Sequence, residues 1–330
     1  MSINLAFWIW TGFNVFVLGC ALFILVRSEW SGLNSSAIWM TIPLAILYAP
    51  VAIHFEYAQT LIVVLALLVC VMRAMECSMD RTAGILLALA GLLRAFPLLL
   101  LVYLAITRRW RVLRWALVGL TIGGALTVAL AGRAAFDFFE GIGWVTRPVM
   151  LRSPANLAIG AVVWRSFSYI LGSPTGGLID PIRRLTIGCI ELGLLAVAIK
   201  VTWPLNGHDP EWGGFSLWIV LAIMLSPVVW PFYLVLLLIP YSQIMIGAYS
   251  GRASMRAILM ALGSYGIIGV TRTAGGSLQI LEPYHALLDQ GALVSLLMAY
   301  VATYWFVTDN SAAISEGRGS ATPSVANAAA

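Results

Sequence analysis

The sequence predicts an all-α, polytopic membrane protein, and three observations support this prediction. Hydrophobic residues make up 61% of the 330 residues and charged residues only 10%, whereas a soluble domain carries roughly 25% charged residues. The mean hydropathy is +0.94. The apolar residues fall into runs of roughly 20, the length that an α-helix needs to cross a bilayer. Because backbone polar groups must be satisfied within the membrane, these runs are predicted to be helices.

About nine to eleven membrane segments are predicted from these runs. The first, residues 3–26, has no basic region before it and is too long for a signal-peptide core, so we expect it to remain as a helix. The other expected segments are residues 37–53, 57–75, 83–106, 115–131, 181–203, 215–227, 231–249, 253–270 and 286–307. An amphipathic stretch from residue 133 to about residue 173 has the pattern of a segment lying in the membrane interface.

The predicted membrane domain covers residues 1–307. Residues 308–330 are rich in Ser, Ala and Gly and poor in apolar side chains. Such a composition cannot bury enough apolar surface to fold, so we expect a disordered C-terminal tail.

The net charge of +5 has a membrane explanation. No basic stripe with interleaved aromatic residues is present, so no nucleic-acid partner is expected, and the arginines instead orient helices by the positive-inside rule. The four cysteines form no CxxC pair, and the three histidines are too widely spaced for an HExxH-type site. The sequence therefore predicts neither a metal site nor a cofactor.

Arg94 is the only charged residue in the run 83–106, and it stands three positions before Pro97. A charge at that depth is costly unless it faces the protein interior or a water-filled cavity. Pro97 interrupts the helical hydrogen bonds at the same place, and broken backbone in the membrane is tolerated only under the same conditions. A guanidinium there suits an anionic group such as a phosphate. The alternative is an arginine near a helix end that extends its head group to the interface.

The arginines also determine the expected topology. Four of them are at positions 108, 109, 111 and 114. Six further basic residues can share their side only if residues 83–106 form a re-entrant hairpin: Arg27, Arg73, Arg81, Lys200, Arg252 and Arg256. The break at Arg94 fits the tip of such a hairpin. The N-terminus then lies outside and the basic cluster lies in the cytoplasm. The alternative, one kinked helix, would place the four arginines outside.

The hairpin topology brings polar residues together at the extracytoplasmic face. His54, Glu56 and Gln59 lie at the junction of the second and third segments, where ordinary interfacial polarity is the alternative explanation. Asn156 and Arg165 lie on the amphipathic stretch.

A break in the chain is also expected at this face, between residues 225 and 240. Prolines at positions 227, 231 and 240 require the helix to stop and restart near Trp230. Ser226 lies at this break, and Arg272 is expected at the same face. Trp230 has two interpretations, an anchor in the aromatic belt of the bilayer or a platform for a sugar.

Four segments resemble glycosyltransferase family 87 in the order expected of that family. They are YAQTLIVVLALLVC (57–70), GILLALAGLLRAFPLLLLVYLAITRRWR (84–111), NLAIGAVVWRSF (156–167) and LSPVVWPFYLVLLLIP (225–240). The family pattern has a Gly-Gln pair opening a helix, a basic residue three positions before a proline, an Asn-Gln-Ser-Leu-like motif, and Ser-Pro-x-Ser-Trp followed by histidine. The matching positions hold Gln59, Arg94 with Pro97, Asn156 with Leu157, and Ser226, Pro227 and Trp230.

The chain also departs from the family pattern. Ala58 replaces the expected glycine, Arg94 the more usual lysine, and Val229 the second serine. Phe232 and Tyr233 stand where a histidine is expected. These departures leave the acid–base group of the reaction unassigned.

The resemblance implies a GT-C-like helical bundle, similar to the polyprenol-phosphate-mannose-dependent mannosyltransferases of actinobacteria. Such an enzyme moves a sugar from a polyprenyl-phosphate donor to a lipid or glycan acceptor at the outer face of the bacterial plasma (inner) membrane. No glycine-rich nucleotide motif is present, which favours that donor over a nucleotide sugar. The implied donor-phosphate ligands are Arg94, Gln59 and Asn156. The implied substrate cavity includes His54, Arg165, Ser226, Trp230 and Arg272.

The resemblance also raises a question about the general base. In GT-C enzymes the first helix runs outward, and the loop after it carries the catalytic Asp or Glu. This chain begins outside, which implies that the leading helix and that loop are missing, and it makes an upstream-encoded fragment a candidate partner. Glu56 is then the best-placed carboxylate. The alternatives are an inactive lipid-binding homologue or scaffold and, less readily, a transporter or flippase with broken helices.

Overall fold

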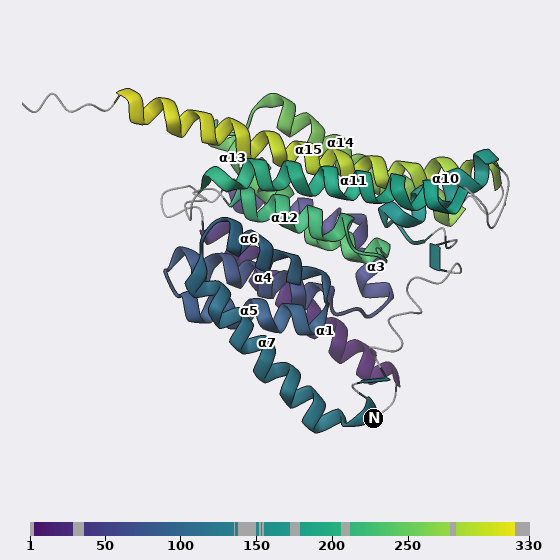
Figure 1. Ribbon diagram of the computed structural model, residues 1–330, viewed down its shortest axis with the longest axis horizontal. Helices are drawn as coiled ribbons and strands as arrows, with labels where there is room; N and C mark the ends of the chain where they lie inside the picture. The colour runs from purple at the N-terminus through teal and green to yellow at the C-terminus, as the bar shows by residue number, and fades with distance from the viewer. Residues whose placement is uncertain are drawn as a thin grey trace, which may run out of the picture.

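A computed structural model of the chain describes residues 3–28, 36–134, 136–137, 150–151, 153, 155–171, 179–205, 212–277 and 282–320. Within these ranges every regular element is a helix, as the sequence predicts (Figure 1). In the described part of the chain, five helical stretches are long and apolar enough to cross a membrane: residues 3–26, 110–131, 179–205, 231–249 and 290–310. The fold is therefore that of an all-α, polytopic membrane protein.

The elements follow the expected segments closely along the chain. Those before the amphipathic stretch are α1 (Ile3–Ser28), α2 (Ser36–Ile46), α3 (Ala49–Glu56), α4 (Leu61–Glu76), α5 (Asp80–Leu93), η1 (Phe96–Leu99), α6 (Leu100–Ile106) and α7 (Trp110–Ala131). From residue 159 onward the elements are α10 (Ile159–Leu171), α11 (Ile179–Thr202), η2 (Trp203–Leu205), α12 (Gly213–Met224), η3 (Pro231–Leu237), α13 (Leu238–Tyr249), α14 (Met255–Ser277) and α15 (Glu282–Ser320).

The segment at residues 37–53 is two helices rather than one. α2 ends at Ile46, Tyr48 has an extended backbone, and α3 begins at Ala49 with Pro50 in its first turn. Proline is well suited to a first turn because its φ is already helical and its missing N–H has no partner to lose there. The break sets the direction of α3, which carries His54 and Glu56.

Residues 83–106 form the expected re-entrant hairpin. α5 ends at Leu93, and Arg94 is extended with φ −150° and ψ 131°. A Cβ on Gly84 would meet Val112 and Ala116 of α7, whereas one on Gly123 would meet Leu92. Residue numbers therefore rise together along α5 and α7, so the two helices are parallel. Because α5 and α7 run in the same direction, the chain between them, η1 and α6, must return to the side on which α5 began. If residues 83–106 were one kinked helix crossing the membrane, α7 would instead run antiparallel to α5.

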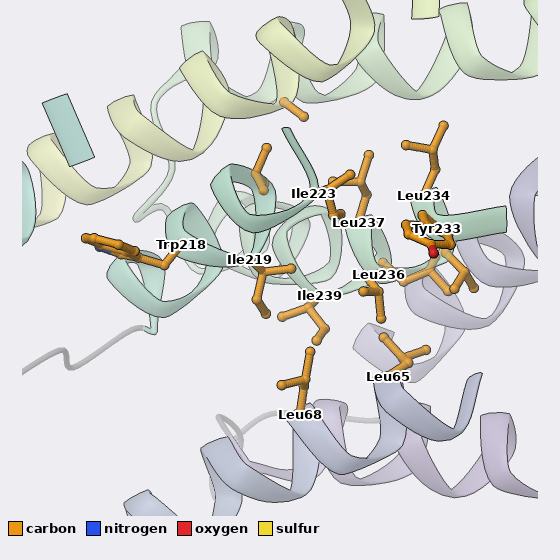
Figure 2. Packing of buried hydrophobic residues seen from close by; sticks show 14 of the residues in the cluster. Leu65, Leu68, Trp218, Ile219, Ile223, Tyr233, Leu234, Leu236, Leu237 and Ile239 are labelled. Atoms are coloured by element: carbon orange, nitrogen blue, oxygen red, sulfur yellow. The ribbon is translucent and has the colours of Figure 1, made fainter. Parts of the chain in front are cut away.

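α12 and the η3–α13 stretch form the centre of the bundle. Every residue of α12 is buried, as expected of a helix that is apolar all round. Figure 2 shows Leu65 and Leu68 of α4 pointing toward Leu236 and Ile239 of this central stretch. By contrast, few residues of α1, α7 and α11 are buried, as in lipid-facing helices.

The C-terminal helix is longer than the sequence predicts. α15 continues past residue 308, where the tail is expected to begin, as far as Ser320. Asp309 forms an ion pair with Arg256 of α14, and this guanidinium lies 5.2 Å from the ring centre of Trp305. These contacts hold α15 against α14 as far as Asp309. Residues 321–330 lie outside the described residues.

Candidate functional site

The turn between α3 and α4 presents the first part of the site. Ala58 has a positive φ of 47°, a left-handed conformation that glycine adopts most easily. Its carbonyl accepts a hydrogen bond of 3.0 Å from Trp10 Nε1 of α1, and the Gln59 N–H donates to the His54 carbonyl at 3.3 Å. The glycine that the family pattern has at position 58 would therefore suit the positive φ that the backbone adopts there. The turn fixes where Gln59 leaves the backbone.

Arg94 lies at the hairpin tip, which we define as residues 94–97, and its half-buried guanidinium reaches both Gln59 and Tyr233. Its Nη2 donates to Gln59 Oε1 at 2.8 Å, and its Nη1 donates to Tyr233 Oη at 3.3 Å. The guanidinium carbon lies 5.5 Å from the centre of the Tyr233 ring. Among the described residues, Nε has no hydrogen-bond partner. The cation is therefore held in place without a neutralising carboxylate in these contacts.

The Gln59 side chain joins the tip to the turn. Its Oε1 accepts from Arg94, and its Nε2 donates to the Tyr57 carbonyl at 3.0 Å. Since both ends of the amide are engaged, Gln59 positions Arg94 through direct contact. The sequence predicts that Gln59 and the hairpin tip lie at the same face, and the structure adds that the Gln59 and Arg94 side chains are in direct contact.

Asn156 is buried and clasps two distant segments of chain. Its amide makes four hydrogen bonds, donating to the carbonyls of Met150 and Pro227 and accepting from the N–H groups of Ala158 and Val229. The backbone adds a bond of 2.7 Å from Leu157 N to Val229 O. Thus Asn156 holds the amphipathic stretch against the break that follows α12.

Three further predicted site residues, Arg165 of α10 and Ser226 and Trp230 of the break, lie around this contact. Arg165 Nη1 donates to the carbonyls of Ser153 and Asn156, at 2.7 and 3.0 Å. Ser226 Oγ donates to the Val228 carbonyl at 2.8 Å. Trp230, half-buried, has an extended backbone immediately before η3. These side chains shape the segment from which Phe232 and Tyr233 project.

His54 packs against α1. His54 and Asn14 are each 1% exposed, and His54 Nε2 lies 3.3 Å from Asn14 Oδ1 of α1. Glu56 is exposed at the end of α3. The side chain of Arg272 lies outside the described residues.

Two contacts of the site were not anticipated from the sequence. Tyr233 supplies the ring and hydroxyl beside Arg94, and the signal was its place where the family pattern has a histidine. Asn14 pairs with His54 across two helices, and a lone Asn in an apolar span gives no indication of its partner.

The opposite end of the hairpin carries the basic cluster. The Arg109 guanidinium lies 5.1 Å from the Trp212 ring, and Trp212 Nε1 donates to Glu76 at 2.7 Å. Glu76 also pairs with Arg73 at 2.8 Å. The end of α4, the end of the hairpin and the start of α12 therefore meet here, far along α5 from Arg94.

No curated protein and no solved structure matches the chain. The family model of glycosyltransferase family 87 matches residues 1–227, well over half of the 330 residues. The matched region contains the turn at Ala58, the hairpin and the Asn156 clasp, which are three of the features that carry the resemblance. The chain therefore belongs to glycosyltransferase family 87, a family of membrane glycosyltransferases.

Proposed function

We propose that this protein transfers a sugar from a polyprenyl-phosphate donor to a lipid or glycan acceptor at the extracytoplasmic face, with Arg94 binding the donor phosphate. Mannose is the first candidate sugar. One observation carries the proposal: a glycosyltransferase of the membrane places a half-buried arginine at the tip of a re-entrant hairpin. Hydrogen bonds to Gln59 and Tyr233 fix that arginine.

The charge of Arg94 matches the needs of the reaction. The acceptor hydroxyl oxygen attacks C1 of the sugar, and the bond from C1 to the phosphate oxygen breaks with its electron pair going to the phosphate. Negative charge therefore grows on the leaving polyprenyl phosphate. A fixed guanidinium stabilises that charge without having to reorganise during the reaction. Gln59 and Tyr233 supply the fixation, since they hold two different nitrogens of the same group.

The acceptor proton must pass to a base, and Glu56 is our candidate. It is exposed and precedes Gln59 by three residues, so it belongs to the same turn. Glu56→Gln should leave donor binding unchanged and lower kcat by about 10²- to 10⁴-fold, the usual effect of losing a positioned base. An unchanged kcat would place the base on another residue.

The experiment that tests the proposal measures binding of polyprenyl phosphate to the full chain in lipid nanodiscs. Arg94→Lys should keep part of the affinity because lysine keeps the charge but loses the planar fork. Arg94→Leu should abolish specific binding, and Arg111→Leu, at the basic end, is the matched control. Equal binding by the parent and Arg94→Leu would contradict the proposal. Donor binding without transfer to any acceptor would instead support a lipid-binding homologue.

A further inference from the structure

We propose that Tyr57 and Phe232 form the platform on which the sugar ring of the donor stacks. This inference rests on the proposed function, because it places the sugar beside a phosphate bound at Arg94. It assigns a role to Phe232, one of the two aromatic residues that stand where the family pattern has a histidine, and to Tyr57, which precedes the turn at Ala58.

A row of aromatic rings runs outward from the hairpin tip. Phe96 lies 5.3 Å from Tyr233 between ring centres, Tyr233 lies 5.3 Å from Phe232, and Phe232 lies 6.0 Å from Tyr57. Arg94 lies over the Tyr233 ring in the middle of this row. The rings therefore lead away from the phosphate-binding cation toward the turn between α3 and α4.

The Tyr57 end of the row is tied directly to Arg94. Gln59 accepts from Arg94 and donates to the Tyr57 carbonyl, so the guanidinium and the backbone of Tyr57 belong to one hydrogen-bonded unit. The left-handed turn at Ala58, held by Trp10, fixes this unit against α1. A sugar joined to the phosphate through one oxygen atom cannot move far from Arg94, which makes the neighbouring rings its natural contacts.

The exposure of the rings shows which of them is open to a ligand. Phe232 and Tyr233 are each 8% exposed, whereas Tyr57 is 62% exposed. Tyr57 thus rests on Phe232 and leaves much of its surface uncovered. The face of an aromatic ring is electron-rich and attracts weakly positive groups, such as the C–H bonds of a pyranose. A ring used only as a belt anchor would contact lipid head groups and would not distinguish a glycosylated donor from free polyprenyl phosphate.

The test compares two probes on the full chain in nanodiscs: polyprenyl-phosphate mannose and the same polyprenyl phosphate without sugar. Tyr57→Ala should weaken binding of the mannosylated lipid about three- to tenfold, the usual range for an aromatic contact, and should leave binding of the sugar-free lipid unchanged. Tyr57→Phe and Tyr57→Trp should retain the parent's preference, since the ring remains. Tyr249→Ala, at another exposed tyrosine, should alter neither affinity.

The outcomes separate this inference from the proposed function. Loss of both affinities in Arg94→Leu, with no change of either in Tyr57→Ala, would overturn the platform while leaving the phosphate site intact. An equal loss of both affinities in Tyr57→Ala would also overturn it, because the effect would then not concern the sugar. Polyprenyl-phosphate glucose serves as a second glycosylated probe beside the mannosylated lipid. Failure of the parent to prefer either glycosylated lipid over the free one would reject the platform.

Discussion

Ala58 occupies a position where the backbone favours glycine. Its φ of 47° brings the Cβ of an L-residue close to the following carbonyl, which costs roughly 1–2 kcal/mol. This strained alanine lies in the turn that positions Tyr57 and Gln59. The hydrogen bond from Trp10 to the Ala58 carbonyl helps to hold this conformation.

We therefore expect Ala58→Gly to stabilise the protein by about 0.5–1 kcal/mol, after the greater freedom of glycine in the unfolded chain is subtracted. Thermal unfolding in detergent measures the effect. Ala66→Gly, in the middle of α4, is the control and should destabilise by a similar amount, since no positive φ is relieved there. A loss of stability in both variants would show that position 58 is not strained.

Asn156 provides a second prediction for a single residue. Asn156→Leu leaves the N–H groups of Ala158 and Val229 and the two carbonyls without their partner, so stability should fall by about 1–3 kcal/mol or more. Ser166→Ala, which removes only a bond back to the Val162 carbonyl, should change it little. Weaker donor binding with stability unchanged would instead support a direct contact with phosphate.

The residue patterns predicted part of the site. The cost of an intramembrane charge indicates Arg94, and the family motifs indicate Gln59 and Asn156, because these signals are local. The partners of Arg94 are distant along the chain, with Tyr233 lying 139 residues away. No periodicity or charge rule specifies such a pairing, because it depends on how the hairpin packs against the segment after α12.

Close contact between α5 and α7 explains the glycines at their interface. An added Cβ at Gly84 would lie 2.6 Å from Trp115 Cβ and 2.6 Å from the Val112 carbonyl oxygen. Backbone atoms cannot turn aside as the end of a side chain can. The two helices approach this closely because the position carries no side chain.

Gly84→Ala should therefore destabilise the hairpin by about 1–3 kcal/mol through overpacking. Gly124 of α7 has no atom within 4 Å of an added Cβ, and Gly124→Ala should be neutral or stabilising by up to about 1 kcal/mol through helix propensity. Denaturation of both variants in the same detergent provides the comparison. Similar effects in the two would mean that α5 and α7 do not pack as described.

The helices themselves were largely predictable, and the exceptions have physical causes. Apolar runs and the arginine bias predicted the hairpin. The break between α2 and α3 was missed because Pro43 lies inside α2, so the prolines alone do not indicate which one ends a helix. Asp309, just beyond the apolar run of α15, pairs with Arg256 of α14, and the composition of residues 308–320 does not reveal this contact.

The topology of the whole molecule gives the remaining prediction. In a background without the four native cysteines, Trp110→Cys should react with a membrane-impermeant reagent only from the cytoplasm, and Ala155→Cys only from outside. Both positions are exposed, whereas the neighbouring Asn156 is buried. Reaction of both from the same side would rule out the hairpin topology, since the start of α7 and the Asn156 segment would then lie on the same side of the membrane.

The shortness of α5 determines how far a donor has to sink into the bilayer. Its 14 residues span about 21 Å, whereas the hydrocarbon layer is about 30 Å thick. In the proposed topology α5 starts at the cytoplasmic boundary, which would place Arg94 about 9 Å or more below the outer one. The proposed polyprenyl-phosphate donor would then have to submerge its phosphate beneath the surrounding head groups. Its prenyl chain would leave sideways among the helices, which suits a long, flexible carrier better than a rigid one.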